Sequence, residues 1–118
     1  MDITIDTQQV AKGIYLLKVR GAVDTYSFDR LKRAITDCFD NNIYRLAVDI
    51  SEVDILTSAA VGVLIGASSI AQENKGDIIL VRPSPDARKL IDLVGLNKLC
   101  GISANTNDAL KLLECRPA

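Results

Sequence analysis

Apolar residues alternate with polar ones at the start of the chain and then recur at helical spacing. Ile3 and Ile5 are separated by polar residues, which predicts an edge strand with one solvated face. Residues 14–19 form a second apolar run after the break at residues 11–13, so we expect the two strands to pair as a hairpin. From about Ser27 the apolar positions repeat every three or four residues, which predicts an amphipathic helix ending near residue 41.

The middle of the chain combines a short apolar strand with a helix rich in small residues. Residues 45–50 have the length and flanks of a buried strand, and residues 51–54 are predicted to form a polar turn. A helix of small and apolar residues is expected from about residue 58 to residue 74. Gly76 is suited to a left-handed cap at the end of that helix.

The last third of the chain alternates again between strand and helix. Residues 77–81 are almost continuously apolar and predict a fourth strand. Pro85 lies in the first turn of a predicted helix that ends at Gly95. Its expected buried stripe consists of Ala87, Leu90, Ile91 and Val94. Residues 99–102 predict a short final strand, and Asn105 is placed to cap a last helix.

This order of elements predicts a single α/β domain over residues 1–118. Strands that alternate with helices at short spacing favour parallel pairs with right-handed crossovers, and the N-terminal hairpin makes the sheet mixed. We therefore expect about four to five strands with about four helices, mainly on one side of the sheet. The last three residues, 116–118, are expected to fray.

Composition and charge argue against several kinds of partner. Lys and Arg (14) nearly balance Asp and Glu (15), and aromatic residues make up 4% of the chain, so no nucleic-acid surface is indicated. No apolar stretch is long enough to span a membrane, and the N-terminus lacks the pattern of a signal peptide. We expect a cytoplasmic protein without direct membrane insertion.

The residue types needed for catalysis and metal binding are scarce. The chain has no histidine, which removes histidine-based hydrolysis and His-ligated metals, and its three cysteines form no C-x-x-C pair. Asp24, Asp49 and Asp54 could gather at one sheet edge, but scattered carboxylates at strand ends are more often solvated. We expect a binding protein rather than an enzyme, with no catalytic residue, no cofactor and no metal.

Ser58 is the candidate functional residue. A hydroxyl residue directly before an apolar helical run can cap the helix by accepting a bond from a free N–H group. The same position can accommodate a phosphate, because free amides and the positive end of the helix dipole point outward there. The residues alone leave both interpretations open. In the same helix, Gly62 and Gly66 have the small-x-x-x-small spacing that predicts close packing, here on the sheet.

Five short stretches follow one another in a characteristic order and spacing along nearly the whole chain. They are residues 21–24 (GAVD), 48–53 (VDISEV), 57–64 (TSAAVGVL), 83–85 (PSP) and 93–99 (LVGLNKL). This combination resembles the STAS domain family, and within it the stand-alone branch, the bacterial anti-sigma factor antagonists.

The resemblance implies a phosphorylation switch. In such proteins the unmodified antagonist binds an anti-sigma factor that is also a GHKL-type serine kinase, and this frees a sigma factor. Phosphorylation releases the antagonist, and a PP2C-type phosphatase restores it. The modified serine falls on Ser58 here, with Thr57 as the less favoured alternative, and Asp24 matches an acidic residue near that serine. We expect little backbone change on modification.

The motif around Ser58 departs from the family's usual D-S-S-G-L. Thr57, Ala59, Ala60 and Val61 stand in place of the aspartate, the second serine, the glycine and the leucine. Loss of the aspartate removes one negative charge beside the site, which could alter kinase preference. The residues expected to contact the partner are Asp24, Thr57, Ser58, Ala59, Val61 and Gly62.

Two other functions found among similar proteins remain open. The chain could be a non-phosphorylated STAS subunit that docks on the ATPase of a lipid transporter, with Ser58 serving only as a helix cap. It could also be a stressosome-type scaffold component.

Overall fold

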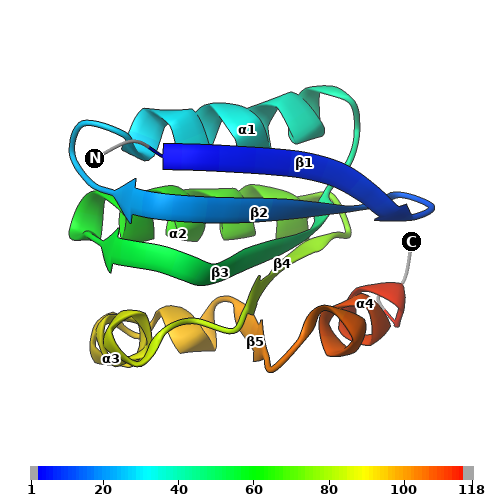
Figure 1. Ribbon diagram of the computed structural model, residues 1–118. Coiled ribbons are helices and arrows are strands. Elements are labelled where there is room, and N and C mark those ends of the chain that lie inside the picture. Colours follow the sequence, from blue (N-terminus) through cyan, green and yellow to red (C-terminus); the bar gives the residue numbers. More distant parts are fainter. Residues whose placement is uncertain (1–2, 116–118) are drawn as a thin grey trace.

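The structure is a computed structural model that describes residues 3–115, built on one mixed five-stranded sheet (Figure 1). The strands lie side by side in chain order: β1 (Ile3–Ala11), β2 (Ile14–Val23), β3 (Arg45–Leu56), β4 (Asp77–Val81) and β5 (Gly101–Ser103). β1 is antiparallel to β2, and the other neighbouring pairs are parallel. The predicted α/β class and N-terminal hairpin are confirmed. The prediction for residues 116–118 concerns a segment outside the described residues.

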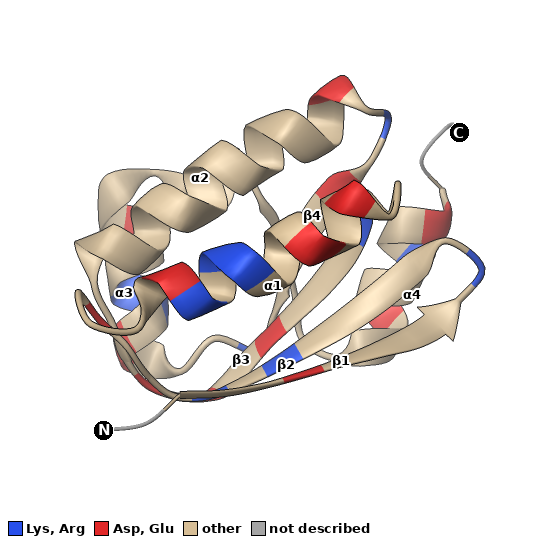
Figure 2. Ribbon diagram, turned by 90° about the horizontal axis from the view of Figure 1, so that it is seen from above, with Lys and Arg blue, Asp and Glu red and all other residues tan. Residues whose placement is uncertain are grey.

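Helices cover both faces of the sheet unequally. They are α1 (Phe28–Asp40), α2 (Ser58–Glu73), α3 (Pro85–Val94) and α4 (Thr106–Glu114), with a short 3-10 helix, η1, at Leu96–Lys98. Figure 2 shows α1 and α2 on one side of the sheet and α4 on the other. Side chains of α1, α2, α3 and η1 share one apolar cluster, and those of α4 belong to a second. The expected excess of helices on one side is confirmed.

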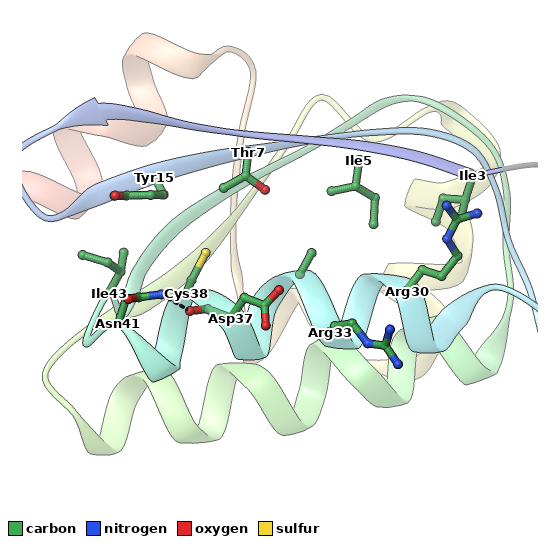
Figure 3. A pocket seen from close by; sticks show the side chains of 11 residues that line it. Ile3, Ile5, Thr7, Tyr15, Arg30, Arg33, Asp37, Cys38, Asn41 and Ile43 are labelled. Atoms are coloured by element: carbon green, nitrogen blue, oxygen red, sulfur yellow. Dashed lines mark hydrogen bonds between the residues drawn. The ribbon is translucent and has the colours of Figure 1, made fainter.

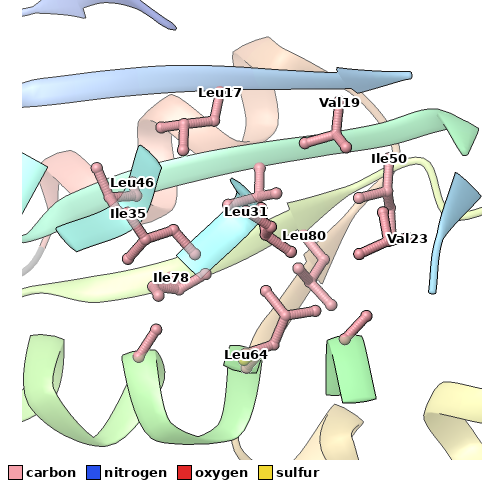
Figure 4. Packing of buried hydrophobic residues seen from close by; sticks show 14 of the residues in the cluster. Leu17, Val19, Val23, Leu31, Ile35, Leu46, Ile50, Leu64, Ile78 and Leu80 are labelled. Carbon is pink, nitrogen blue, oxygen red and sulfur yellow. The ribbon is translucent and has the colours of Figure 1, made fainter. Parts of the chain in front are cut away.

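The two clusters follow from the period-two alternation of the central strands. Leu17 and Leu46 point toward α1 and α2, where they join Leu64 in the larger cluster (Figure 4). Leu16 and Ala47 point to the opposite face and pack in the cluster of α4. Because β4 is covered on both faces, all five of its residues are buried, which explains its continuous apolar sequence.

The predicted turn at residues 51–54 is wrong, because β3 continues through it to Leu56. The far end of β3 pairs with β2 at Gly21–Val53 and Val23–Leu56, with register shifts between the regular stretches. Val53 is buried while its neighbours Glu52 and Asp54 are exposed. The polar residues therefore belong to the solvated face of a strand whose backbone is satisfied by β2.

Gly76 does not form the predicted left-handed cap. Lys75 adopts the positive φ of 64° instead. Gly76 is buried, and a Cβ atom there would collide with the carbonyl oxygen of Tyr44. A close approach between two backbone segments, rather than a helix end, explains this glycine.

Two details near α3 also differ from prediction. Val94 is 45% exposed, so it does not belong to the buried stripe of α3. The final strand begins at Gly101 rather than at residue 99, because η1 occupies the segment directly after the helix. Gly95, with φ of 80°, ends α3 as predicted.

Candidate functional site

The candidate site lies at the carboxyl ends of the parallel strands β2 and β3, which end next to each other. The backbone N–H and the hydroxyl Oγ1 of Thr57 both donate to the carbonyl oxygen of Val23, at 3.1 and 3.0 Å. Asp24 follows Val23, and Ser58 follows Thr57. This contact therefore places Asp24 and Ser58 at the same end of the molecule, directly after two neighbouring strands.

Ser58 is the first residue of α2, and its side chain is exposed. Among residues 3–115 its hydroxyl has no hydrogen-bond partner. The N-cap position belongs to Thr57, which has extended backbone angles (φ −97°, ψ 171°) and makes no side-chain cap. The interpretation of Ser58 as a helix cap is therefore wrong: the cap position lies one residue earlier, and its hydroxyl bonds to β2.

The first turn of α2 is open to an acceptor from outside. The first backbone bond of the helix runs from the N–H of Val61 to the carbonyl of Thr57, at 3.1 Å. No acidic residue lies in this turn, and no side chain accepts from it. Free N–H groups at a helix start favour a negative charge, because their dipoles add along the helix axis.

Asp24 orders the loop between β2 and α1. Its Oδ1 atom accepts from the backbone N–H groups of Tyr26 and Ser27, at 2.9 and 3.1 Å. The bond from Tyr26 is the main cause that lowers the pKa of Asp24 below its ordinary value. The carboxylate is thus a fixed negative charge at the same end of the sheet as Ser58, where β2 and β3 end.

The exposed face of α2 nearest Ser58 includes two glycines. Gly62 and Gly66 are exposed, and a Cβ atom at either position would meet nothing within 4 Å. The predicted close packing of these glycines on the sheet is wrong, because other residues of α2 make that contact. Val61 is 4% exposed and belongs to the core cluster, which removes its side chain from the predicted partner surface.

A groove of about 360 Å³ lies between α1 and α2. It begins at Ala59, next to Ser58, and passes Gly62 and Gly66. Its α1 wall is formed by Phe28, Lys32, Ile35, Thr36 and Phe39. The sequence prediction missed this groove. Glycine inside a helix lowers stability relative to alanine, so Gly62 and Gly66 were a signal that this face of the helix has a role other than helix stability.

The structure brings five of the six predicted contact residues to one surface. Asp24, Thr57, Ser58, Ala59 and Gly62 are partly or fully exposed around the start of α2, and only Val61 is not. Within residues 3–115 no group of three His, Cys, Asp or Glu side chains is arranged to hold a metal ion. In the same part of the chain, no helix has the length and apolarity needed to cross a membrane.

Comparison with known proteins adds a family to this geometry. Residues 6–109 match the family model described as the STAS domain. An anti-sigma-B factor antagonist of Staphylococcus aureus is 23% identical over 106 residues, which cover 90% of this chain and 97% of that protein.

Solved structures show the same architecture. The crystal structure of an anti-sigma factor antagonist from Mycobacterium paratuberculosis is 25% identical, covers 96% of this chain and 95% of its own, and superposes with a TM-score of 0.87. The Bacillus protein SpoIIAA in its phosphorylated form is 18% identical, with 92% and 98% of the two chains covered and a TM-score of 0.73.

Proposed function

This chain belongs to the STAS domain family, and on that premise we propose that it is an anti-sigma factor antagonist that switches partners at Ser58. The unmodified form binds an anti-sigma factor with GHKL-type serine kinase activity, and a sigma factor is thereby freed. Phosphorylation of Ser58 releases the antagonist, and a PP2C-type phosphatase restores it. The chain itself is a bacterial, cytoplasmic binding protein and not an enzyme.

One observation carries this proposal: Ser58 is an exposed hydroxyl, without a hydrogen bond to residues 3–115, at the first position of a helix that lacks a side-chain cap. A kinase can reach such a hydroxyl without unfolding the protein. Its modification also costs the fold no existing hydrogen bond. The relatives named as antagonists support the same assignment.

The fold tolerates a phosphate at this place. A phosphoserine adds about −1.5 to −2 charges and three acceptor oxygens. The free N–H groups in the first turn of α2 offer donors to those oxygens, and the helix dipole favours the charge. The backbone is therefore expected to keep its conformation when Ser58 is modified.

A partner docked on the same surface does not tolerate the phosphate. The surface around Ser58 includes small residues such as Ala59 and Gly62, which allow a partner to approach the helix backbone closely. A dianion buried there without a matching cation loses its hydration, and the ionised Asp24 at the same edge adds repulsion. Addition of charge is thus sufficient to lower the affinity for the partner.

Thr57 is the weaker candidate for modification. Its hydroxyl is partly buried and donates to the carbonyl of Val23 at 3.0 Å. Transfer of a phosphoryl group to this oxygen would remove one of the two hydrogen bonds that Thr57 donates to Val23 at the end of β2. Ser58 carries no such constraint.

The test is a pull-down from native lysate with three baits: wild type, Ser58→Asp and Ser69→Asp. Ser69 is an exposed serine on the same helix, so it controls for added charge alone. Wild type and Ser69→Asp are expected to retain an anti-sigma factor kinase that Ser58→Asp loses. Retention of one membrane-associated ATPase by all three baits would favour a transporter subunit and refute the switch.

A further inference from the structure

β1 leaves one edge of the sheet open. Within residues 3–115 it pairs with β2 alone, so alternate N–H and C=O groups along it point away from the sheet. Edge strands are often protected from other strands by Lys or Pro, and β1 contains neither. Its one charged residue, Asp6, lies 3.0 Å from Nη1 of Arg20 and so already has a partner.

A groove of about 460 Å³ follows this edge, between β1 and α1 (Figure 3). Its apolar lining comprises Ile3, Ile5, Tyr15, Ala34, Cys38 and Ile43. Burial raises the pKa of the Cys38 thiol, which therefore stays neutral. A groove with a largely apolar lining thus lies directly beside the unpaired edge of the strand.

The α1 side chains that line this groove change from positive to negative charge along the helix. Arg30 and Arg33 lie toward the end of the groove that contains Ile3, and Asp37 follows one turn later (Figure 3). The side chains of these three residues make no ion pair or hydrogen bond with any other residue of the described range. This side of the groove therefore presents two cations and then an anion, all without a partner inside residues 3–115.

We propose that this edge is the interface of a homodimer in which β1 pairs antiparallel with β1 of a second copy. A two-fold axis sets the same surface against itself in reverse order. The cationic part of one α1 then faces the acidic part of the other, with Arg33 opposite Asp37 of the second copy. The order of charges along α1 is therefore complementary to itself.

Element spacing agrees with this arrangement. α1 packs over both β1 and β2, and neighbouring strands lie about 4.8 Å apart. A helix centred between β1 and β2 lies about 4.8 Å, one strand spacing, from a two-fold axis midway between the two paired β1 strands. The two α1 helices lie on either side of this axis, so they would be about 10 Å apart. Packed helices are commonly separated by about 8–10 Å, and each α1 would therefore cover the groove of the other copy.

The dimer does not obstruct the candidate site. Ser58 lies at the end of the sheet where β2 and β3 finish, and antiparallel pairing places the two copies of this end on opposite sides of the assembly. Each copy therefore remains able to bind a partner. The proposed dimer rests on β1 and α1 and does not depend on the function of Ser58.

Sedimentation over a dilution series tests the dimer. Wild type is expected to be dimeric at high concentration and to dissociate on dilution. Arg33→Asp and Asp37→Arg should each weaken the dimer by about tenfold or more, because like charges then face each other twice across the axis. The double variant Arg33→Asp with Asp37→Arg restores opposite charges and should recover most of the affinity. Lys32→Asp, on the side of α1 that faces α2, is the matched control and should behave as wild type.

Hydrogen exchange then locates the interface. The amides of β1 should exchange more slowly at high concentration in wild type and in the double variant, but not in the single variants, with circular dichroism confirming that all are folded. A wild type that is monomeric at every concentration overturns the proposal. So does a dimer that protects another element, or a double variant as weak as the single ones.

Discussion

α2 and α3 begin in opposite ways. At α3, Ser84 accepts from the N–H of Ala87 at 3.2 Å, Pro85 occupies the first turn, and Asp86 adds a negative charge there. At α2 the first turn has no capping side chain and no acidic residue, and the hydroxyl of Thr57 bonds to β2 instead. The start of α3 thus has a side-chain cap, a proline and an acidic residue, and the start of α2 has none of the three.

α4 shows that the difference is not a property of helices that follow strands. Its N-cap, Asn105, accepts from the N–H of Asp108 at 2.8 Å. The side chains of Ser84 and Asn105 therefore cap α3 and α4, whereas α1 and α2 have no side-chain cap bond. α1 has the acidic Asp29 in its first turn, so among the four described α-helices only α2 begins with neither a side-chain cap nor an acidic residue. An uncapped start is what a switch requires, since a side chain that permanently occupied the free amides would compete with a phosphate.

The largest expected effect separates the two serines at these helix starts. Ser84→Ala should lower the free energy of unfolding by about 0.5–2 kcal/mol, because it removes a cap. Ser58→Ala removes no hydrogen bond within the described residues and should stay within about 0.5 kcal/mol of wild type. Urea unfolding of both variants measures the difference. Equal losses would mean that the Ser58 hydroxyl is structural.

A smaller effect is expected from the glycines on the outer face of α2. Gly62→Ala and Gly66→Ala should each raise the free energy of unfolding, by up to about 1 kcal/mol, since alanine favours helix and a Cβ atom fits at both positions. Gly62 lies one turn from Ser58, whereas Gly66 lies two turns away. Gly62→Ala should therefore weaken binding of the anti-sigma partner more than Gly66→Ala. If both variants bind as tightly as wild type, the small-residue face is not part of the interface.

The smallest expected effect concerns acid stability at Asp24. Its pKa is lowered in the folded state, so its contribution to stability is present above the ordinary aspartate range and is lost as the pH falls through that range and below. Asp24→Asn keeps an oxygen that can accept from Tyr26 but does not titrate. Wild type should therefore lose stability more steeply than Asp24→Asn on acidification below about pH 4. Parallel unfolding curves in acid would contradict this.

The sequence was sufficient for the fold where the hydrophobic pattern is regular. α1, α2, β4 and α3 were predicted with nearly correct ends, because periodicity and the flanking proline and glycines agree there. Residues 51–54 were mispredicted as a turn because most of their side chains are polar. Their backbone is nevertheless held by β2, and such long-range pairing leaves little trace in local sequence.

The candidate site was predicted in its chemistry but not in its geometry. The sequence located Ser58 at a helix start and Asp24 at a strand end, and the structure brings both to one edge. It could not show that Thr57 is the N-cap, because the competing acceptor, Val23, lies 34 residues away along the chain. Nor could it show that Gly62 and Gly66 face outward, since spacing alone does not say which side of a helix is buried.

The affinity of the anti-sigma partner for the unmodified and the Ser58-phosphorylated protein tests the central claim most directly. We expect phosphorylation to weaken binding by about 2–5 kcal/mol in a calorimetric titration, the cost of burying an unpaired charge. Backbone amide shifts should change only around the start of α2 and the Asp24 loop. Equal affinities, or shifts that spread across the sheet, would contradict a switch that acts through charge alone.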